Sequence, residues 1–121
     1  MRVLIVGSRT FNDYELLKTS LDDILREVTD TIEIVSGGAN GADRFAERYA
    51  KEKGYGLHIV RAEWNLYGKR AGYLRNAKMH EYISGDEKRI CVAFWDGISK
   101  GTQHSFTLAD TYNNPLTVIK F

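Results

Sequence analysis

The residues best suited to chemistry form a glycine-rich segment after a short apolar run, Ser36-Gly37-Gly38-Ala39-Asn40-Gly41-Ala42-Asp43. Glycine has no Cβ, so its backbone can approach a ligand closely, and it readily adopts the positive φ of a tight turn. A helix is expected to begin at the end of this segment, and the unpaired N–H groups and dipole of a helix N-terminus favour an anion. The segment is therefore a candidate phosphate-binding loop.

The alternative is a strand-to-helix turn that needs glycine for its geometry alone. The segment lacks the Gly-Lys-Ser/Thr ending of a P-loop and the G-x-G-x-x-G spacing of a dinucleotide fingerprint. A second corner, Ser99-Lys100-Gly101-Thr102, opens a later predicted helix, and two helix starts facing one crevice suit one extended anionic ligand. Asp43 either completes a helix cap with Asn40 or accepts a hydrogen bond from a ribose hydroxyl.

Two further groups of polar residues are candidates for ligand contact. Gly7, Ser8 and Arg9 leave the first predicted strand, and arginine is suited to bidentate contact with phosphate or carboxylate. On a later predicted helix, the spacing i, i+3, i+4, i+7 puts four residues on one face: Gly72, Arg75, Asn76 and Met79. We expect Arg75 and Asn76 to contact ligand and Met79 to lie in the core, whereas an exposed arginine or a solvated helix face is the ordinary alternative.

Large aromatic residues and a carboxylate occupy the connection that runs through Glu63, Trp64 and Tyr67. Trp64 or Tyr67 could stack on a base, because aromatic rings offer flat contact surface. The same residues could equally form an apolar plug over the end of the sheet.

The carboxylate of Asp96 follows a buried strand directly, which suits either a functional acid or the Asp96-Gly97 turn. His104 lies in the first turn of the following helix and could point toward the same place. No Cys/His cluster has metal-ligand spacing, so no metal site is expected, and no Ser/His/Asp set of a hydrolase is found.

Strand patterns alternate with helix patterns along the whole chain. Continuous apolar runs predict strands at 3–6, 32–36, 57–60, 89–95 and 116–121. Apolar residues at helical spacing predict helices at 13–28, 42–53, 70–84 and 102–112, the first capped by Asn12 and the second ended by Gly54. This alternation predicts an α/β fold in three layers, a Rossmann-like doubly wound parallel sheet of five strands in the order 3-2-1-4-5. The loops after strands one, two and four then meet at one edge, where ligands bind in such sheets.

Length and composition limit the classes of protein to consider. A chain of 121 residues is expected to form one domain, 1–121, and its net charge of +1 gives no general reason to bind nucleic acid or a membrane surface. The single cysteine, Cys91, lies within an apolar strand and is expected to be buried. With no disulfide and no signal-peptide core or membrane span, a cytoplasmic location is expected.

Four stretches together resemble the YspA/YpsA-related branch of the SLOG superfamily: Val-Gly-Ser-Arg-Thr-Phe (6–11), Ser-Gly-Gly-Ala-Asn-Gly-Ala-Asp-Arg-Phe-Ala (36–46), Glu-Trp-x-x-Tyr-Gly-x-x-Ala-Gly-x-x-Arg-Asn-x-x-Met (63–79) and Phe-Trp-Asp-Gly-x-Ser-x-Gly-Thr-x-His (94–104). The resemblance implies a Rossmann-like domain, found in bacteria and phages, that senses or processes nucleotides and their derivatives. The superfamily includes cytokinin-activating phosphoribohydrolases and the domain of DNA-processing protein A. Where the phosphoribohydrolases have Pro-Gly-Gly-x-Gly-Thr-x-x-Glu, this chain has Ser36 for proline and Ala42-Asp43 after the last glycine.

The first hypothesis is a module that binds a nucleotide-derived ligand such as ADP-ribose, NAD or a signalling nucleotide and requires no cofactor. Phosphates would contact Gly37 to Gly41 and Gly101-Thr102, flanked by Ser36 and Ser99, while Asn76 and Asp43 would bind ribose or base edges. The second is a nucleotide N-glycosidic hydrolase, in which Glu63, Asp43 or Asp96 would activate water or stabilise an oxocarbenium-like transition state. The third, a DNA-associated protein, is disfavoured by the near-neutral charge. Family analogy adds the expectation of a homo-oligomer.

Overall fold

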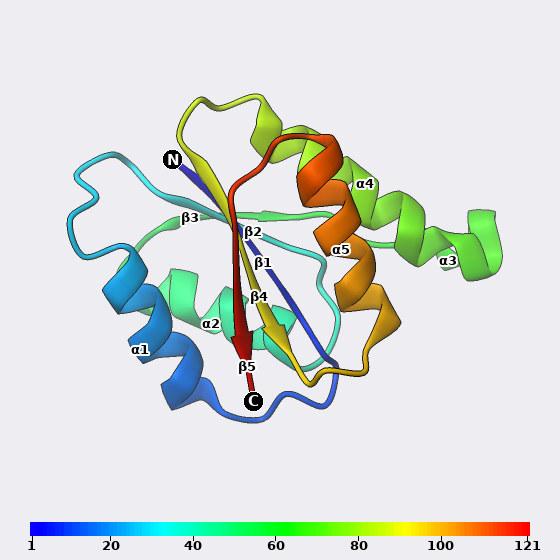
Figure 1. Cartoon of the computed structure of the whole chain (residues 1–121), viewed down its shortest axis with the longest axis horizontal. Helices are drawn as coiled ribbons and strands as arrows, with labels where there is room; N and C mark the ends of the chain where they lie inside the picture. The colour runs from blue at the N-terminus through cyan, green and yellow to red at the C-terminus, as the bar shows by residue number, and fades with distance from the viewer.

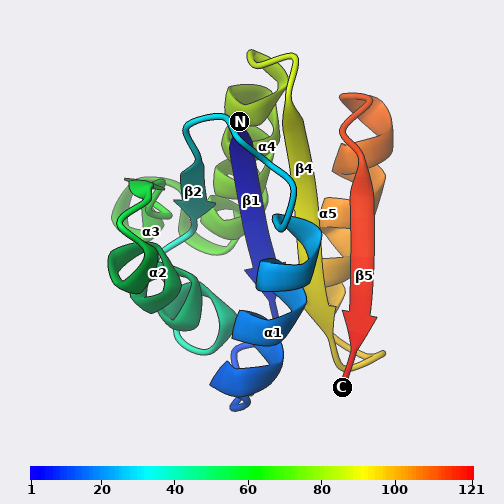
Figure 2. The ribbon, with the colours of Figure 1, turned by 90° about the vertical axis from the view of Figure 1, so that its left-hand side faces the viewer.

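Five parallel strands form one sheet in the order β3-β2-β1-β4-β5. A computed structural model describes all residues 1–121 (Figures 1 and 2). The strands are β1 (Arg2–Gly7), β2 (Glu33–Ser36), β3 (Gly56–Ile59), β4 (Arg89–Trp95) and β5 (Leu116–Lys120). The helices are α1 (Tyr14–Ile24), α2 (Ala42–Lys53), α3 (Trp64–Tyr67), α4 (Ala71–Ser84) and α5 (Lys100–Thr111), with a 3₁₀ turn η1 (Gly68–Arg70). The Rossmann-like fold and the strand order expected from the sequence are confirmed.

Alternate residues of the central strand face two separate apolar cores. Val3 and Ile5 of β1 pack with residues of α1 and α2, whereas Leu4 and Val6 pack with Met79 and Ile83 of α4. Figure 1 shows α1 and α2 on one side of the sheet and α4 and α5 on the other. Because both faces are covered, the central strands are apolar throughout, which is why they read as continuous runs rather than alternating ones.

The chain reverses its direction of winding between β1 and β4. β1 pairs with β2 on one side and with β4 on the other, and Gly7 lies opposite Phe94 at the carboxyl end of that second pair. The loops that leave β1 and β4 therefore start side by side and diverge to opposite layers. Such a divergence opens a crevice beyond the strand ends, and it is the usual place for a ligand in this architecture.

Helix α1 differs from its predicted form at both ends. Asp13, not Asn12, is the N-cap, and its Oδ1 accepts a hydrogen bond of 3.0 Å from the Leu16 amide. The helix ends at Ile24 rather than continuing to residue 28, because the chain turns after Leu25. The apolar residues beyond that point still pack against the core, which is why helical spacing alone suggested a longer helix.

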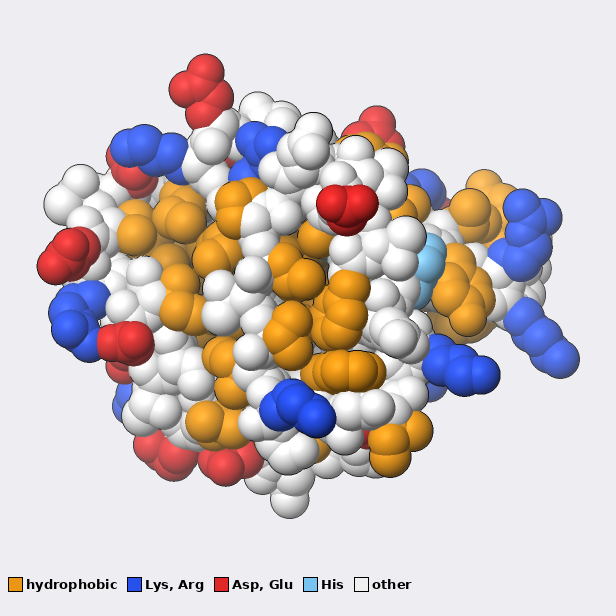
Figure 3. Space-filling view, viewed as in Figure 1, with side chains coloured by type: hydrophobic (Ala, Val, Ile, Leu, Met, Phe, Trp, Pro, Cys, Tyr) orange, Lys and Arg blue, Asp and Glu red, His pale blue; other side chains and the backbone are white.

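The connection between β3 and α4 is more ordered than expected, since it contains α3 and η1. Neither element has a buried residue, and in Figure 1 α3 projects away from the rest of the molecule. Figure 3 shows Lys and Arg side chains gathered at this projecting end, beside exposed hydrophobic ones. The exposed side chains of α3 and η1 include Trp64, Leu66, Tyr67, Lys69 and Arg70.

Cys91 lies on β4 in the core beneath α4, as expected. Burial raises the pKa of its thiol to about 12, so the side chain is an unreactive small apolar group. None of the helices combines the length and the apolar character needed to cross a membrane.

Candidate functional site

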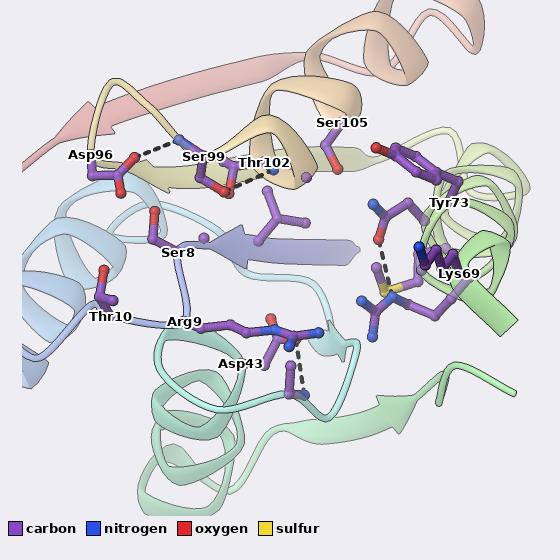
Figure 4. Close-up of a pocket in the computed structure, with 18 of the residues that line it drawn as sticks. Ser8, Arg9, Thr10, Asp43, Lys69, Tyr73, Asp96, Ser99, Thr102 and Ser105 are labelled. Atoms are coloured by element: carbon purple, nitrogen blue, oxygen red, sulfur yellow. Dashed lines mark hydrogen bonds between the residues drawn. The ribbon is translucent and has the colours of Figure 1, made fainter. Parts of the chain in front are cut away.

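A cavity of about 400 Å³ lies beyond the carboxyl ends of β1 and β4 (Figure 4). It is bounded by the loop after β1, the start of α2, the start of α5 and one face of α4. The residues that line it are Val6, Gly7, Ser8, Arg9, Thr10, Ala39, Asp43, Trp64, Lys69, Gly72, Tyr73, Arg75, Asn76, Met79, Asp96, Ser99, Gly101, Thr102 and Ser105. The cavity is thus built by chain segments that are distant in the sequence, as the strand order predicts.

The start of α5 forms one end of the cavity. Ser99 is the N-cap, and its Oγ accepts a hydrogen bond of 3.4 Å from the Thr102 amide. Gly101 lies in this first turn, and a Cβ built on it would meet no atom within 4 Å. Packing and backbone conformation therefore do not require glycine here. A ligand that approaches the α5 backbone closely would require glycine at this position. The free amides at the start of the helix would suit an anion.

Two buried serine hydroxyls in the lining of the cavity have no hydrogen-bond partner within the protein. Ser8 is 3% exposed and Ser105 is 1% exposed, and both line the cavity. Ser8 lies close enough to Asp96 to help lower the pKa of that carboxyl, but its Oγ has no partner in hydrogen-bond geometry. Buried polar atoms nearly always have partners, so these two hydroxyls are free to bond to water or to a ligand in the cavity.

The carboxylate of Asp96 is already occupied by its own turn. Its Oδ1 accepts hydrogen bonds of 2.8 Å from the Ser99 amide and 2.9 Å from the Ile98 amide. These two bonds lower the pKa of Asp96, and they hold the loop that leads into α5. Gly97 completes the turn with φ +86. Asp96 therefore supports the turn that the sequence suggested, while one side of it still borders the cavity.

Arg75 crosses from α4 to the glycine-rich segment. Its Nη1 donates a hydrogen bond of 2.7 Å to the Gly37 carbonyl, and its Nε donates one of 3.0 Å to Asn76 Oδ1. Burial lowers the pKa of Arg75, and the nearby Asp43 carboxylate opposes that effect. The predicted polar face of α4 is real: Gly72, Arg75, Asn76 and Met79 all border the cavity, and Met79 also belongs to the core.

Asp43 is the buried carboxyl group of the cavity. Its Oδ2 accepts a hydrogen bond of 3.1 Å from the Ala39 amide. Burial raises the pKa of Asp43 to about 6, although the Ala39 bond and the Arg75 charge act in the opposite direction. A carboxyl group with this pKa exists in both protonation states near neutral pH and can therefore donate or accept a proton.

Part of the glycine-rich segment is occupied by its own hydrogen bonds and packing. The Gly38 amide donates to Ser36 Oγ at 3.2 Å, and Gly41 has φ +76 and lies so close to Ser8 that an added Cβ would be 2.5 Å from its carbonyl oxygen. Glycine is thus required at position 41 by conformation and packing. Of the two alternatives for Asp43, the cap shared with Asn40 is not formed, because Gly41 is the N-cap of α2 and makes no side-chain hydrogen bond.

The predicted site residues divide into two groups. Eleven line the cavity: Gly7, Ser8, Arg9, Asp43, Trp64, Arg75, Asn76, Asp96, Ser99, Gly101 and Thr102. Seven lie outside its lining: Ser36, Gly37, Gly38, Asn40, Gly41, Glu63 and Tyr67. Gly37 still acts on the cavity indirectly, since its carbonyl holds Arg75.

Sequence reasoning assigned no role to four polar residues of the lining, Thr10, Lys69, Tyr73 and Ser105, whereas Ala39 belonged to the predicted phosphate loop. A signal existed for two of them. Ser105 follows Gly101 by one helical turn, and Tyr73 follows Lys69 by the same spacing. His104 does not line the cavity, and instead its ring packs edge-to-face with Tyr73 at a centroid distance of 4.8 Å.

The positive charges of the cavity come from three elements. Arg9 leaves β1 and is exposed, Lys69 lies on η1, and Arg75 is held by α4. The guanidinium carbon of Arg9 lies 5.9 Å from the centre of the Trp64 ring, so Arg9 spans toward α3. These three cationic side chains outnumber the two carboxyl groups of the lining, Asp43 and Asp96, so the cavity is suited to an anionic ligand.

Fold and cavity together define a Rossmann-like α/β protein with a polar pocket at the switch point of its sheet. The chain belongs to the YspA, cpYpsA-related SLOG family, whose model matches residues 1–67. It is 37% identical over 120 residues to the Gene 61 protein of Mycobacterium phage D29, covering 95% of this chain and 93% of that one. The phage relative fits the expected occurrence in bacteria and phages.

A solved structure resembles the chain more remotely. It is described as the predicted subunit of tRNA methyltransferase from Methanocaldococcus jannaschii DSM, with 16% identity and a TM-score of 0.44. The match covers 98% of this chain and 68% of that one.

Proposed function

We propose that this protein binds a nucleotide-derived ligand in the cavity, with a phosphate group at the start of α5. The observation that carries the proposal is the pair of buried, unpartnered hydroxyls of Ser8 and Ser105 beside the open backbone of Gly101. A phosphate oxygen accepts hydrogen bonds from serine hydroxyls and from helix amides alike. The family supports the nucleotide class, and Arg9, Arg75 and Lys69 supply the opposing charge.

This proposal moves the phosphate away from the glycine-rich segment 36–43. The Gly38 and Ala39 amides of that segment are used by Ser36 and Asp43, and the carboxylate of Asp43 would repel an anion. Asn76 and Asp43 lie deeper between α2 and α4 and remain suited to ribose hydroxyls. Self-association stays a prediction, and sedimentation of the free and ligand-bound protein measures it.

The proposal is tested by thermal unfolding and calorimetry with inorganic phosphate, ribose 5-phosphate, AMP, ADP-ribose and NAD. A ligand that binds only the folded state raises the midpoint, by about 2.7 kcal/mol of stability at one hundred times its Kd. Ser105→Ala removes an orphaned hydroxyl, so the free protein should keep or gain stability while affinity falls. Ser84→Ala is the matched control, because Ser84 lies at the far end of α4.

Two results would overturn the proposal. One is that no phosphate-bearing compound shifts the unfolding midpoint. The other is that Ser105→Ala and Ser84→Ala bind the ligand with equal affinity, which would remove the phosphate from the α5 end.

A second candidate function, N-glycosidic hydrolysis, is favoured by one observation, the raised pKa of the buried Asp43. Asp43 is the acid of the cavity best suited to proton transfer, since Asp96 is held by its turn and Glu63 lies outside the lining. Hydrolysis would break the N-glycosidic bond, adding the hydroxyl of water to the ribose and a proton to the base, which is released. Under this candidate Asp43→Asn should abolish base release from a bound nucleotide, whereas Glu63→Gln should not. Binding without any base release would leave binding as the function.

A further inference from the structure

Tyr73 of α4 borders the cavity beside α5, further along that helix than Ser99 and Thr102. Figure 4 shows Tyr73 and Lys69 on one side and Asp96, Ser99 and Thr102 on the other. Tyr73 lines the cavity and yet is 52% exposed, so its ring is available to a ligand that enters from solvent. The sequence offered Trp64 or Tyr67 for stacking, and of these two Trp64 lines the cavity and Tyr67 does not.

The ring of Tyr73 is supported from α5. His104 packs against it edge-to-face, with an angle of 82° between the rings. Burial lowers the pKa of His104, which favours the neutral imidazole, and the ring packs against Tyr73 as a support. An exposed ring with one side supported is an organised platform rather than a freely rotating side chain.

The second aromatic residue of the lining, Trp64, comes from the projecting helix α3. It is 49% exposed, and the guanidinium carbon of Arg9 lies 5.9 Å from its ring centre. Tyr73 differs from Trp64 in lying on the long helix α4, which also supplies Arg75 and Asn76. Trp64 also approaches α4, since a Cβ built on Gly72 would lie 3.4 Å from its Cη2, but Tyr73 is on the same helix as Arg75 and Asn76 and its ring packs on α5.

We propose that Tyr73 is the platform on which the planar base of the ligand stacks, which makes it a determinant of nucleotide over sugar-phosphate binding. This inference rests on the proposed function, because it takes the phosphate at the α5 end as the other anchor. Stacking needs a flat aromatic surface and no specific hydrogen bond, so the preference is for a base of any identity over none. Tyr67, exposed but outside the cavity, has no such role.

The test compares AMP with ribose 5-phosphate, which lacks the base, on the wild-type chain and on Tyr73→Leu, Tyr73→Phe and Tyr67→Leu. Tyr73→Leu should weaken AMP binding by about fivefold or more, the scale of one lost base stack, and leave ribose 5-phosphate within about twofold. Tyr73→Phe and Tyr67→Leu should bind both ligands as the wild type does. Circular dichroism verifies that each variant is folded, which the exposure of both tyrosines favours.

Each outcome separates this inference from the function beneath it. If the wild type binds neither ligand, both the proposed function and the stacking role of Tyr73 are wrong. If both ligands bind and Tyr73→Leu weakens both equally or neither, the platform is wrong while the phosphate site stands. A loss for Tyr67→Leu alone would assign the stacking to α3 instead.

Discussion

At the scale of single residues, the cavity contains residue types that neither the packing nor the backbone of the free protein requires. Gly101 has space around it and no unusual backbone conformation, and Ser8 and Ser105 bury hydroxyls without partners. Each choice is neutral or unfavourable for folding, since glycine weakens a helix and an unpaired buried hydroxyl loses its hydrogen bonds to water. Gly41, in contrast, is explained by φ and packing alone. Gly101, Ser8 and Ser105 therefore point to a ligand, whereas Gly41 is explained by the fold.

Gly101→Ala should have opposite effects on the stability of the free protein and on its affinity for ligand. Alanine favours the helix, so the free protein should gain up to about 1 kcal/mol of stability. The added methyl group would occupy the space between the α5 backbone and the phosphate, so affinity for ribose 5-phosphate should fall by about tenfold, which corresponds to 1.4 kcal/mol. Chemical denaturation and calorimetry measure the two effects. Gln103→Ala, on the same helix but outside the cavity, is the control, and equal affinities for both variants would contradict this account.

At the scale of elements, helix ends decide where the functional loops begin. α1 must start soon after the Ser8–Arg9 loop, and α2 and α5 must start at the cavity edge. Asp13 caps α1 through the Leu16 amide, and Ser99 caps α5 through the Thr102 amide. α2 has no side-chain cap, and its start is instead positioned by the contact of Gly41 with the loop after β1.

The cap of α1 gives a direct test, because the sequence predicted Asn12 and the structure has Asp13. Asp13→Ala should lower the free energy of unfolding by about 1 kcal/mol, the usual cost of a lost N-cap. Asn12→Ala, one residue earlier, should change it by less than about 0.5 kcal/mol, as an exposed position does. Urea denaturation of the two variants beside the wild type measures this difference. A larger loss of stability in Asn12→Ala than in Asp13→Ala would instead assign the cap to Asn12.

At the scale of the whole molecule, stability between pH 4 and 6.5 contains two opposing contributions. Burial raises the pKa of Asp43 to about 6, so the folded state binds more protons there than the unfolded chain and stability falls as pH rises. Burial lowers the pKa of His80 to about 4, so the folded state binds fewer protons and stability rises with pH. His80 is fully buried beside Asn114, whose Nδ2 lies 3.1 Å from its Nδ1.

Single substitutions should expose each contribution. With Asp43→Asn, stability should increase with pH more steeply than in the wild type, by on the order of 2 kcal/mol between pH 4 and 6. With His80→Gln, it should increase less steeply or decrease over the same interval. Urea denaturation at half-unit steps of pH measures all three curves. Parallel curves would show that neither group changes its pKa on folding.

The sequence by itself determined the order of strands and helices, the two-faced core and the edge of the sheet where polar loops gather. These follow from apolar periodicity, glycine turns and the handedness of βαβ connections, all of which are local or general properties of the chain. It also identified the polar face of α4 through Arg75 and Asn76, because helical spacing alone defines that face.

Only the tertiary structure decided which of the two glycine corners is open. In segment 36–43 the Gly38 and Ala39 amides bond to Ser36 and Asp43, and Gly41 packs against the loop after β1, a contact between residues far apart in the sequence. Tyr73 and Ser105 enter the cavity because α4 and α5 pack beside each other on one face of the sheet, and this packing determines how their side chains meet. Distances between elements depend on how whole surfaces pack, and no local pattern of residue types encodes them.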